Sequence, residues 1–290
     1  MSKLTDGELI EELHQRMAEK SRALDELKIL NRRLHESEKL KSHFISNITN
    51  EIVNPFASIL GLSKNILSVD KENWKKVFSM VAMIHSEAFS LDFQLKNIFA
   101  AASIEAGEMV PEIGQADIRK IVKNVTESFR IEATKKKVVI ETVFNEGDKL
   151  SCFKSDPEKL TLILSNLINN AVKFSFEKNR VLVTAGINSE MLEVSVLNKG
   201  AQISDEYRSF IFDRFKRIDS EITSINRGHG LGLSIIKSLL DLLEGEIQFQ
   251  SEDDGTIFTF KVPEGTQKVP SFATSIGGNE LFFDDDNQVF

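Results

Sequence analysis

Three polar side chains at helical spacing could hold a magnesium ion and a phosphate group. Segment 157–175 has a helical pattern of apolar residues, and Asn166, Asn170 and Lys173 lie on a different face of it. Carboxamide oxygens can bind Mg²⁺, and an ammonium group pairs with phosphate oxygens. The apolar face consists of Leu160, Ile163, Leu164, Leu167 and Ala171. This helix is therefore a candidate wall of a nucleotide site.

Two segments with glycines follow that helix. A predicted strand continues into 198–202, Asn-Lys-Gly-Ala-Gln, and segment 228–234, Gly-His-Gly-Leu-Gly-Leu-Ser, opens a predicted helix. The free N–H groups and the dipole of a helix N-terminus suit an anionic phosphate. A glycine run alone is a weak signal. The three segments occur in order, with 28 residues from Asn170 to Asn198 and 30 from Asn198 to Gly228, and together they favour a nucleotide site.

The elements around these segments predict an α/β sandwich, domain 111–263, with a largely antiparallel sheet facing helices. Apolar periodicity predicts helices at 115–135, 157–175, 205–216 and 231–243. Strands are predicted at 138–144, 180–187, 191–197, 246–250 and 256–262.

The apolar pattern of the first 40 residues predicts a parallel coiled coil, which we take as a separate domain, 1–40. A helix is expected from residue 8 to about 40, with a mostly apolar a/d seam and the polar Asn31 at an a position. The apolar seam residues are Ile10, Leu13, Met17, Leu24, Leu27 and Leu34. A single solvated helix that packs on its own chain is the alternative.

The pattern of residues 41–107 predicts a second domain, an antiparallel helical hairpin. Helices are expected at 44–67 and 74–102, and Pro55 is expected to kink the first of them. His85 falls on the apolar stripe of the second helix, so we expect it to be packed in a core. An apolar face this wide is better buried in a dimeric four-helix bundle than in one chain, and we therefore expect a homodimer.

Composition excludes several classes of protein. The 36 Lys and Arg against 44 Asp and Glu give a formal net charge of −8, which argues against nucleic-acid binding through overall charge. The single Cys152 excludes an intramolecular disulfide, and with five scattered histidines it offers no zinc cluster. No apolar stretch approaches the roughly 18 residues that span a bilayer, and the N-terminus is too polar for a signal peptide. We expect a cytoplasmic protein without membrane insertion, ending in an acidic disordered tail at 264–290 that leaves a docking-peptide role open.

From about residue 40 to 263 these motifs resemble the two-component sensor histidine kinases. The resemblance implies an α+β fold: an N-terminal coiled coil and a dimeric helical hairpin (four-helix bundle), followed by an α/β sandwich ATP-binding domain of the gyrase/Hsp90/kinase/MutL type. Segment 166–174, Asn-Leu-Ile-Asn-Asn-Ala-Val-Lys-Phe, is similar to the asparagine box of that family. By this resemblance Asn170 would bind Mg²⁺, Asn166 would assist it and Lys173 would contact phosphate, with ATP or ADP as the nucleotide.

Three further segments carry the resemblance. Segment 210–219 looks like the phenylalanine box, with Arg217 placed to reach phosphates, and a lid over the nucleotide would run from about 204 to 227. Segment 255–260 resembles the closing glycine-threonine strand. Segment 228–235 resembles the second glycine box, whose nucleotide-binding residues here would be Gly228, His229, Gly230, Leu231 and Gly232.

The first glycine box departs from the family pattern Asp-x-Gly-x-Gly. Asn198 replaces the aspartate that accepts a hydrogen bond from the adenine amine, Gly200 is retained, and Gln202 replaces the second glycine. The Asn198 side-chain oxygen can still accept, but without the strength that a charge gives. The bulk of Gln202 restricts the loop beside the base. We therefore expect nucleotide binding to be weakened.

The predicted hairpin departs from the family pattern at the residue that would accept the phosphoryl group. Segment 44–61 resembles the phosphoacceptor box, His-Glu-x-x-(Asn/Thr)-Pro, with Glu51 as the acid/base partner and Asn54 at the water-positioning place, but Asn50 stands where the histidine belongs. An imidazole nitrogen offers an in-plane lone pair to phosphorus, whereas the lone pair of an amide nitrogen is delocalised into its carbonyl. Asn50 therefore cannot accept the phosphoryl group. His43, one heptad earlier, lacks the adjacent acidic partner.

The favoured hypothesis is a degenerate kinase, a pseudokinase of a two-component pathway. As a homodimer it would regulate a partner histidine kinase or a receiver-domain response regulator by contact. Two alternatives stay open: an active kinase in which Asn50 was introduced in place of histidine, and a nucleotide-independent dimer scaffold. A receiver phosphatase that uses Glu51 and Asn54 is a weaker idea, because it would have to work without the histidine.

Overall fold

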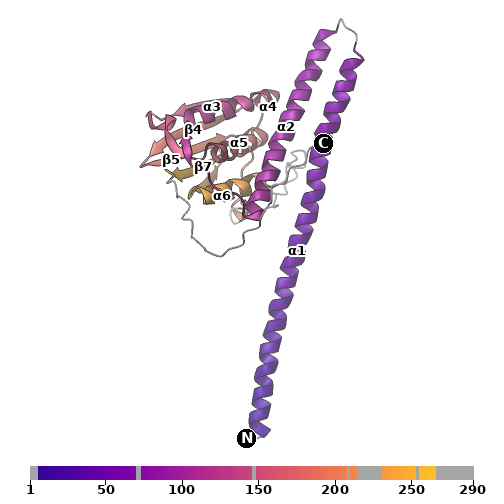
Figure 1. Ribbon diagram of the computed structural model, residues 1–290, viewed down its shortest axis with the longest axis vertical. Coiled ribbons are helices and arrows are strands. Elements are labelled where there is room, and N and C mark those ends of the chain that lie inside the picture. Colours follow the sequence, from indigo (N-terminus) through magenta and orange to yellow (C-terminus); the bar gives the residue numbers. More distant parts are fainter. Residues whose placement is uncertain are drawn as a thin grey trace, which may run out of the picture.

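A computed structural model of the chain describes residues 6–69, 73–145, 148–207, 210–213, 230–252 and 255–265. Its N-terminal part is a helical hairpin of α1 (Asp6–Leu67) and α2 (Trp74–Ala106). The two helices run antiparallel and side by side, and α1 extends far beyond the end of α2 (Figure 1). Asn73 caps α2 at its start by accepting from the backbone N–H of Lys76, and Gly107 ends it in the left-handed conformation with φ 70°.

The separate helices expected at 8–40 and 44–67 are one continuous helix, α1. The heptad pattern slips between them, but residues 36–43 contain no glycine or proline. A slip of this kind changes which side chains face a partner and leaves the backbone helical. Pro55 lies inside α1 and does not end it.

One stripe of the hairpin is apolar and exposed in the single chain. Trp74 is 75% exposed and Phe78 is 77% exposed, and His85 is exposed on the same side of α2. The expectation of a core-packed His85 is therefore wrong for the single chain, because no element of the described chain covers this stripe. Other exposed apolar residues of the hairpin are Val53, Phe56, Leu60, Leu67, Val81 and Phe99.

The C-terminal part is a sandwich of helices on a five-stranded sheet, which confirms the expected α+β class. The strand order is β2-β4-β5-β7-β6, in which only the β2–β4 pair is parallel. The strands are β2 (Val139–Phe144), β4 (Arg180–Asn188), β5 (Met191–Asn198), β6 (Glu246–Glu252) and β7 (Gly255–Pro263). The covering helices are α3 (Ile118–Ser128), α5 (Pro157–Phe174) and α6 (Gly232–Leu242).

Burial alternates strictly along β5 and β7, so one face of the sheet forms the core under the helices. The buried apolar residues of these two strands are Leu192, Val194, Val196, Phe258, Phe260 and Val262. Helix α5 contacts α3, α6 and β5, which makes it the central helix of the layer. The asparagines of the predicted site therefore stand on the helix that the rest of the domain holds in place.

Several local expectations need correction. The helix expected at 115–135 is interrupted at Phe129, which separates α3 from α4 (Arg130–Lys135). The helix expected at 205–216 is only a short 3₁₀ turn, η2 (Asp205–Tyr207), within the described residues.

The sequence patterns did not predict three small elements, nor the contact made by the start of the tail. These elements are β1 (Gly114–Ala116), β3 (Phe153–Ser155) and the 3₁₀ turn η1 (Asp148–Ser151); β1 and β3 pair as a small antiparallel sheet. At the start of the predicted tail, the Gly265 N–H donates to the Lys154 carbonyl at 2.8 Å. The remainder, 266–290, lies outside the described residues.

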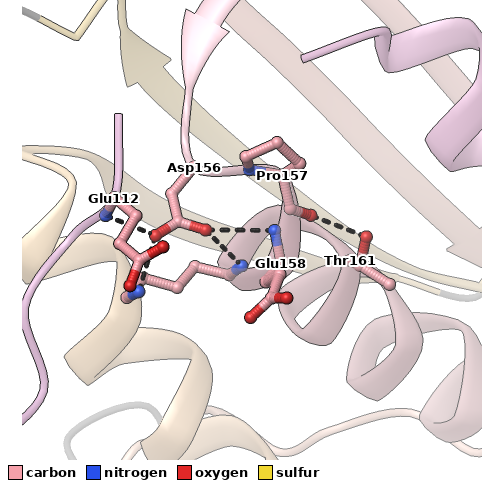
Figure 2. A network of polar contacts seen from close by, with 6 residues as sticks. Glu112, Asp156, Pro157, Glu158 and Thr161 are labelled. Carbon is pink, nitrogen blue, oxygen red and sulfur yellow. Dashed lines mark hydrogen bonds and ion pairs between the residues drawn. The ribbon is translucent and has the colours of Figure 1, made fainter. Parts of the chain in front are cut away.

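The carboxylate of Asp156 fixes the start of α5 and the connection that leads from the hairpin into the sandwich (Figure 2). Asp156 is 1% exposed. It accepts from the backbone N–H groups of Glu158 and Lys159, each at 3.0 Å, and from the Lys159 ammonium at 2.6 Å. It also accepts from the N–H of Glu112, which lies before β1, at 2.7 Å. One side chain thus caps the central helix and anchors the preceding chain to it.

The pKa of Asp156 reflects this environment. Burial by itself raises the pKa, but the hydrogen bonds from Lys159 and from the Glu112 N–H, together with the Lys159 charge, outweigh burial. The pKa is therefore lowered below its ordinary value of 3.8. A carboxyl group whose pKa is lower in the folded state stabilises the fold above its unfolded pKa, and that contribution disappears as pH falls through the folded value.

We predict that Asp156→Ala lowers the free energy of unfolding by about 2–4 kcal/mol at neutral pH, because the substitution removes a helix cap and leaves a mostly buried ammonium unpaired. Urea unfolding measures the loss. The matched control is Asp117→Ala at the start of α3, where within the described residues the carboxylate accepts from the Lys120 N–H alone; about 1 kcal/mol is expected. The difference between Asp156→Ala and the unmodified chain should shrink below about pH 4. Equal losses for the two variants would contradict the anchoring role.

Candidate nucleotide site

The N-terminus of α6 lies directly against the two asparagines of α5. Gly232 is the first residue of α6, and a Cβ atom there would lie 2.8 Å from Asn166 Oδ1 and 3.7 Å from Asn170 Nδ2. Asn166 is 3% exposed and Asn170 is partly exposed. Only a residue without a side chain permits this approach. The helix of the predicted asparagine box and the second glycine segment, which are far apart in sequence, therefore meet.

The first turn of α6 is suited to an anion. Leu231, at the N-cap position, is buried and provides no side-chain cap, and Gly230 before it has φ 67°. The first N–H groups of a helix have no intrahelical partner, and the helix dipole favours negative charge beside them. The partly exposed Asn170 adjoins this end of α6.

The end of β5 lies beside the end of α5. The Phe176 N–H donates to the Lys199 carbonyl at 2.8 Å, and Ser175 forms a β-bridge with Gly200. A Cβ atom on Gly200 would lie 2.0 Å from the Phe174 carbonyl oxygen, so glycine is required there. Asn198, the last residue of β5, is buried. The Asn198 segment and the asparagine helix are thereby brought to one end of the sandwich.

The closing strand also reaches Asn198. Gly255 begins β7 with φ 137°, and a Cβ atom there would lie 2.3 Å from the Asn198 carbonyl oxygen. The exposed Gln202 donates from Nε2 to the Ser251 carbonyl at 3.4 Å, and the Ile203 N–H donates to Ser251 Oγ at 2.9 Å. The side chain of Gln202 therefore contacts the β6–β7 hairpin.

Lys173 is partly exposed near the end of α5. Its ammonium lies 5.3 Å from the ring centroid of Phe174, and its carbonyl oxygen accepts from the Lys136 ammonium. Burial lowers the pKa of Lys136, although the charge of Glu177 partly raises it again. Lys136 thus caps the C-terminus of α5, while Lys173 holds its charge near the surface.

The remaining predicted site residues take no part in the α5–α6 arrangement described above or lie outside the described residues. Arg217, Gly228 and His229 lie outside the described residues. Asn50 and Glu51 are in α1, but the structure does not describe their side chains. Asn54, one turn later, is exposed.

Sequence reasoning missed Asn97 of α2. The amide of Asn166 donates to Asn97 Oδ1 at 2.7 Å, and both side chains are buried. The available signal was a single polar residue among the apolar Phe93, Ala100 and Ile104, all at helical spacing on α2. The apolar stripe that periodicity indicated on this helix, which includes His85, lies on another face of α2.

The residues present fit a nucleotide-held magnesium ion better than a carboxylate cage. Among the described residues no group of three His, Cys, Asp or Glu could hold a metal. Mg²⁺ is often bound by one or two protein oxygens together with substrate phosphates. The Asn170 carboxamide, beside the N-terminus of α6, can supply such an oxygen.

Comparisons with known proteins agree with this arrangement. Residues 155–266 match the family described as "Histidine kinase-, DNA gyrase B-, and HSP90-like ATPase". Histidine kinase P4 of Formosa agariphila is 28% identical over 237 residues, which cover 80% of this chain and 17% of that protein. The circadian input-output histidine kinase CikA of Synechococcus elongatus is 23% identical over 261 residues, which cover 86% of this chain and 34% of that protein.

A solved structure shows the same fold. Full-length ShkA in complex with AMPPNP aligns with a TM-score of 0.54 at 24% identity, covering 79% of this chain and 46% of that one.

Residues 155–266 thus form an ATP-binding domain of the histidine kinase, gyrase B and HSP90 type. Over 80–86% of its length the chain is similar in sequence to these histidine kinases. It spans between 17% and 34% of the length of these relatives. In the described part of the chain, no helix has both the length and the apolar character needed to cross a membrane.

We predict that Gly232→Ala lowers the free energy of unfolding by about 1–3 kcal/mol, because the added methyl group overlaps Asn166 Oδ1 in a packed site. Chemical denaturation measures the change. Gly61→Ala is the matched control, since nothing lies within 4 Å of its added Cβ and alanine favours the helix. If the Gly232→Ala chain is as stable as the Gly61→Ala control, then α6 does not pack closely against Asn166.

Proposed function

We propose that this chain is a histidine kinase-like signalling protein that binds ATP or ADP with Mg²⁺, does not phosphorylate itself at position 50, and acts by contact with a partner. The observation that carries this proposal is the combination of an assembled α5–α6 site with Asn50 at the acceptor position of the hairpin. The first supports nucleotide binding, and the second removes the nucleophile.

The nucleotide part of the proposal assigns a role to each element of the site. Mg²⁺ bound with the nucleotide would supply charge neutralisation for its phosphates, and Asn170 would hold it. The uncapped first turn of α6 and the Lys173 ammonium would bind phosphate oxygens. Asn198 would accept from the adenine amine less strongly than an aspartate, which supports modest affinity.

The acceptor part follows from amide chemistry. Autophosphorylation would require Asn50 to attack the γ-phosphorus with a nitrogen lone pair that is delocalised into its carbonyl. Output by contact is then the remaining route, with a partner histidine kinase or a receiver-domain response regulator as the class of partner. The exposed apolar stripe of the hairpin supports a homodimer in which a second copy completes a four-helix bundle.

The test of this function is transfer of γ-labelled phosphate from Mg-ATP. We expect no acid-labile phosphate on the unmodified chain and clear labelling of Asn50→His, because the imidazole restores the missing nucleophile. The matched control is Asn47→His, which adds an imidazole elsewhere on α1. The double variant Asn50→His/Asn170→Ala should lose the label if Asn170 holds the metal.

Thermal unfolding with and without Mg-ADP distinguishes a nucleotide-binding pseudokinase from a nucleotide-independent dimer scaffold. A ligand that binds only the folded chain must raise its melting temperature. Labelling of the unmodified chain would contradict the pseudokinase proposal. An absence of both labelling and thermal stabilisation at millimolar nucleotide would instead favour a nucleotide-independent dimer scaffold.

We predict that Phe78→Glu raises the dissociation constant of the dimer by about thirtyfold or more, because a large aromatic side chain buried at an interface contributes at least about 2 kcal/mol. Sedimentation equilibrium of the full chain measures the shift. Ser79→Glu adds the same charge at the neighbouring exposed position and should leave the dimer intact. A monomeric unmodified chain, or a fully dimeric Phe78→Glu chain, would exclude this stripe as the dimer interface.

A further inference from the structure

One face of α2, distinct from the exposed stripe, packs on the ATP-binding domain (Figure 1). At its centre the rings of Phe89 and Phe93 meet the buried ring of Phe129 edge-on, at centroid distances of 5.2 and 5.8 Å. Phe129 is the residue that separates α3 from α4. This aromatic contact holds the domain against the hairpin in the described structure.

Polar contacts flank the aromatic rings on both sides. Toward the start of α2, Ser86 Oγ donates to Glu132 Oε1 at 3.2 Å and accepts from the Lys135 ammonium. Toward its end, Asn97 meets Asn166. The second carboxylate oxygen of Glu132 is buried, and in the described structure no hydrogen-bond partner reaches it. Water would give this oxygen a partner if the interface opened, which lowers the free-energy cost of releasing the domain.

The Asn97–Asn166 contact uses the full donor capacity of Asn166. Its Nδ2 group donates to Asn97 Oδ1 at 2.7 Å and to the Leu162 carbonyl at 3.0 Å. A carboxamide nitrogen carries two hydrogens, so both are engaged. The Asn166 oxygen then points to Gly232, at the first turn of α6. Asn97 itself is held, because its own Nδ2 donates to the Phe93 carbonyl at 3.0 Å.

We propose that Asn97 is a positioning residue that links docking of the ATP-binding domain on α2 to occupancy of the nucleotide site. While α2 is docked, Asn97 fixes the orientation of the Asn166 carboxamide and withholds its amide group from a ligand at the α5–α6 junction. Release of α2 frees that amide. Docking and nucleotide therefore compete for Asn166, and by linkage each weakens the other. The nucleotide half of this inference rests on the proposed function, whereas the docking half does not.

Docking is measured by the distance between two spin labels on the full chain. One label sits on the exposed native Cys152 and the other on Lys96→Cys, an exposed position of α2. Labelled chain is mixed with excess unlabelled chain, so that a dimer contributes one label pair. Asn97→Leu is the test variant, and Glu105→Leu, at an exposed position of α2, is the matched control.

We expect one narrow distance distribution in the reference and control chains. Asn97→Leu should lower the docked-to-released ratio by about tenfold, the effect of leaving a buried amide without its acceptor. Asn97→Leu/Asn166→Leu should recover docking, because no polar group is then buried unpaired. A rescue of this kind separates a paired contact from a general loss of stability. A broad distribution in the reference chain, or no change in Asn97→Leu, overturns the positioning role.

Calorimetric titration with Mg-ADP tests the linkage. Because the docked state withholds Asn166, Asn97→Leu should bind Mg-ADP about three- to tenfold more tightly than the reference and the control. Equal affinities in all three chains would overturn the linkage while leaving the proposed function intact. If none of the chains binds Mg-ADP, the proposed function fails, and the label distances alone decide whether Asn97 positions the domain.

Discussion

The carboxamide of Asn166 is the point where the hairpin, the central helix of the sandwich and the second glycine segment meet. Its nitrogen is shared between α2 and the α5 backbone, and its oxygen faces the first residue of α6. A buried polar group must have its partners, or it costs free energy comparable to a lost hydrogen bond. The position of α2, the need for glycine at 232 and the orientation of the α5–α6 junction are therefore tied to one side chain.

Asp156 performs a comparable task at the start of α5. Its carboxylate holds the first turn of that helix and the chain that enters the domain, so α5 is fixed at its start by a charge and near its middle by an amide. A central helix fixed in this way holds Asn170 beside α6 and Asn166 against α2.

Local patterns predicted much of this fold. The apolar period of α5 and α6 and the alternation along β5 and β7 were sufficient to place those elements within one or two residues. Predictions failed where a distant contact decides the backbone. The break between α3 and α4 falls at Phe129, whose ring is buried against Phe89 and Phe93 of the hairpin, a contact that no local pattern contains. The expected break in α1 failed for a local reason, because nothing in residues 36–43 stops a helix. Strands β1 and β3 are too short to show a period and exist only as a pair.

The types of the candidate site residues were determined by the sequence: two asparagines and a lysine on one helix face, a glycine run that opens another helix, and an asparagine at position 50 in the segment that resembles a phosphoacceptor box. These follow from residue chemistry and short-range spacing. Tertiary structure decided which of them are available. It buries Asn166 against Asn97, leaves Asn170 beside α6, directs Gln202 toward the β6–β7 hairpin and exposes His85. The physical reason is that periodicity marks the face a helix buries, whereas only the folded chain determines which group lies across from it.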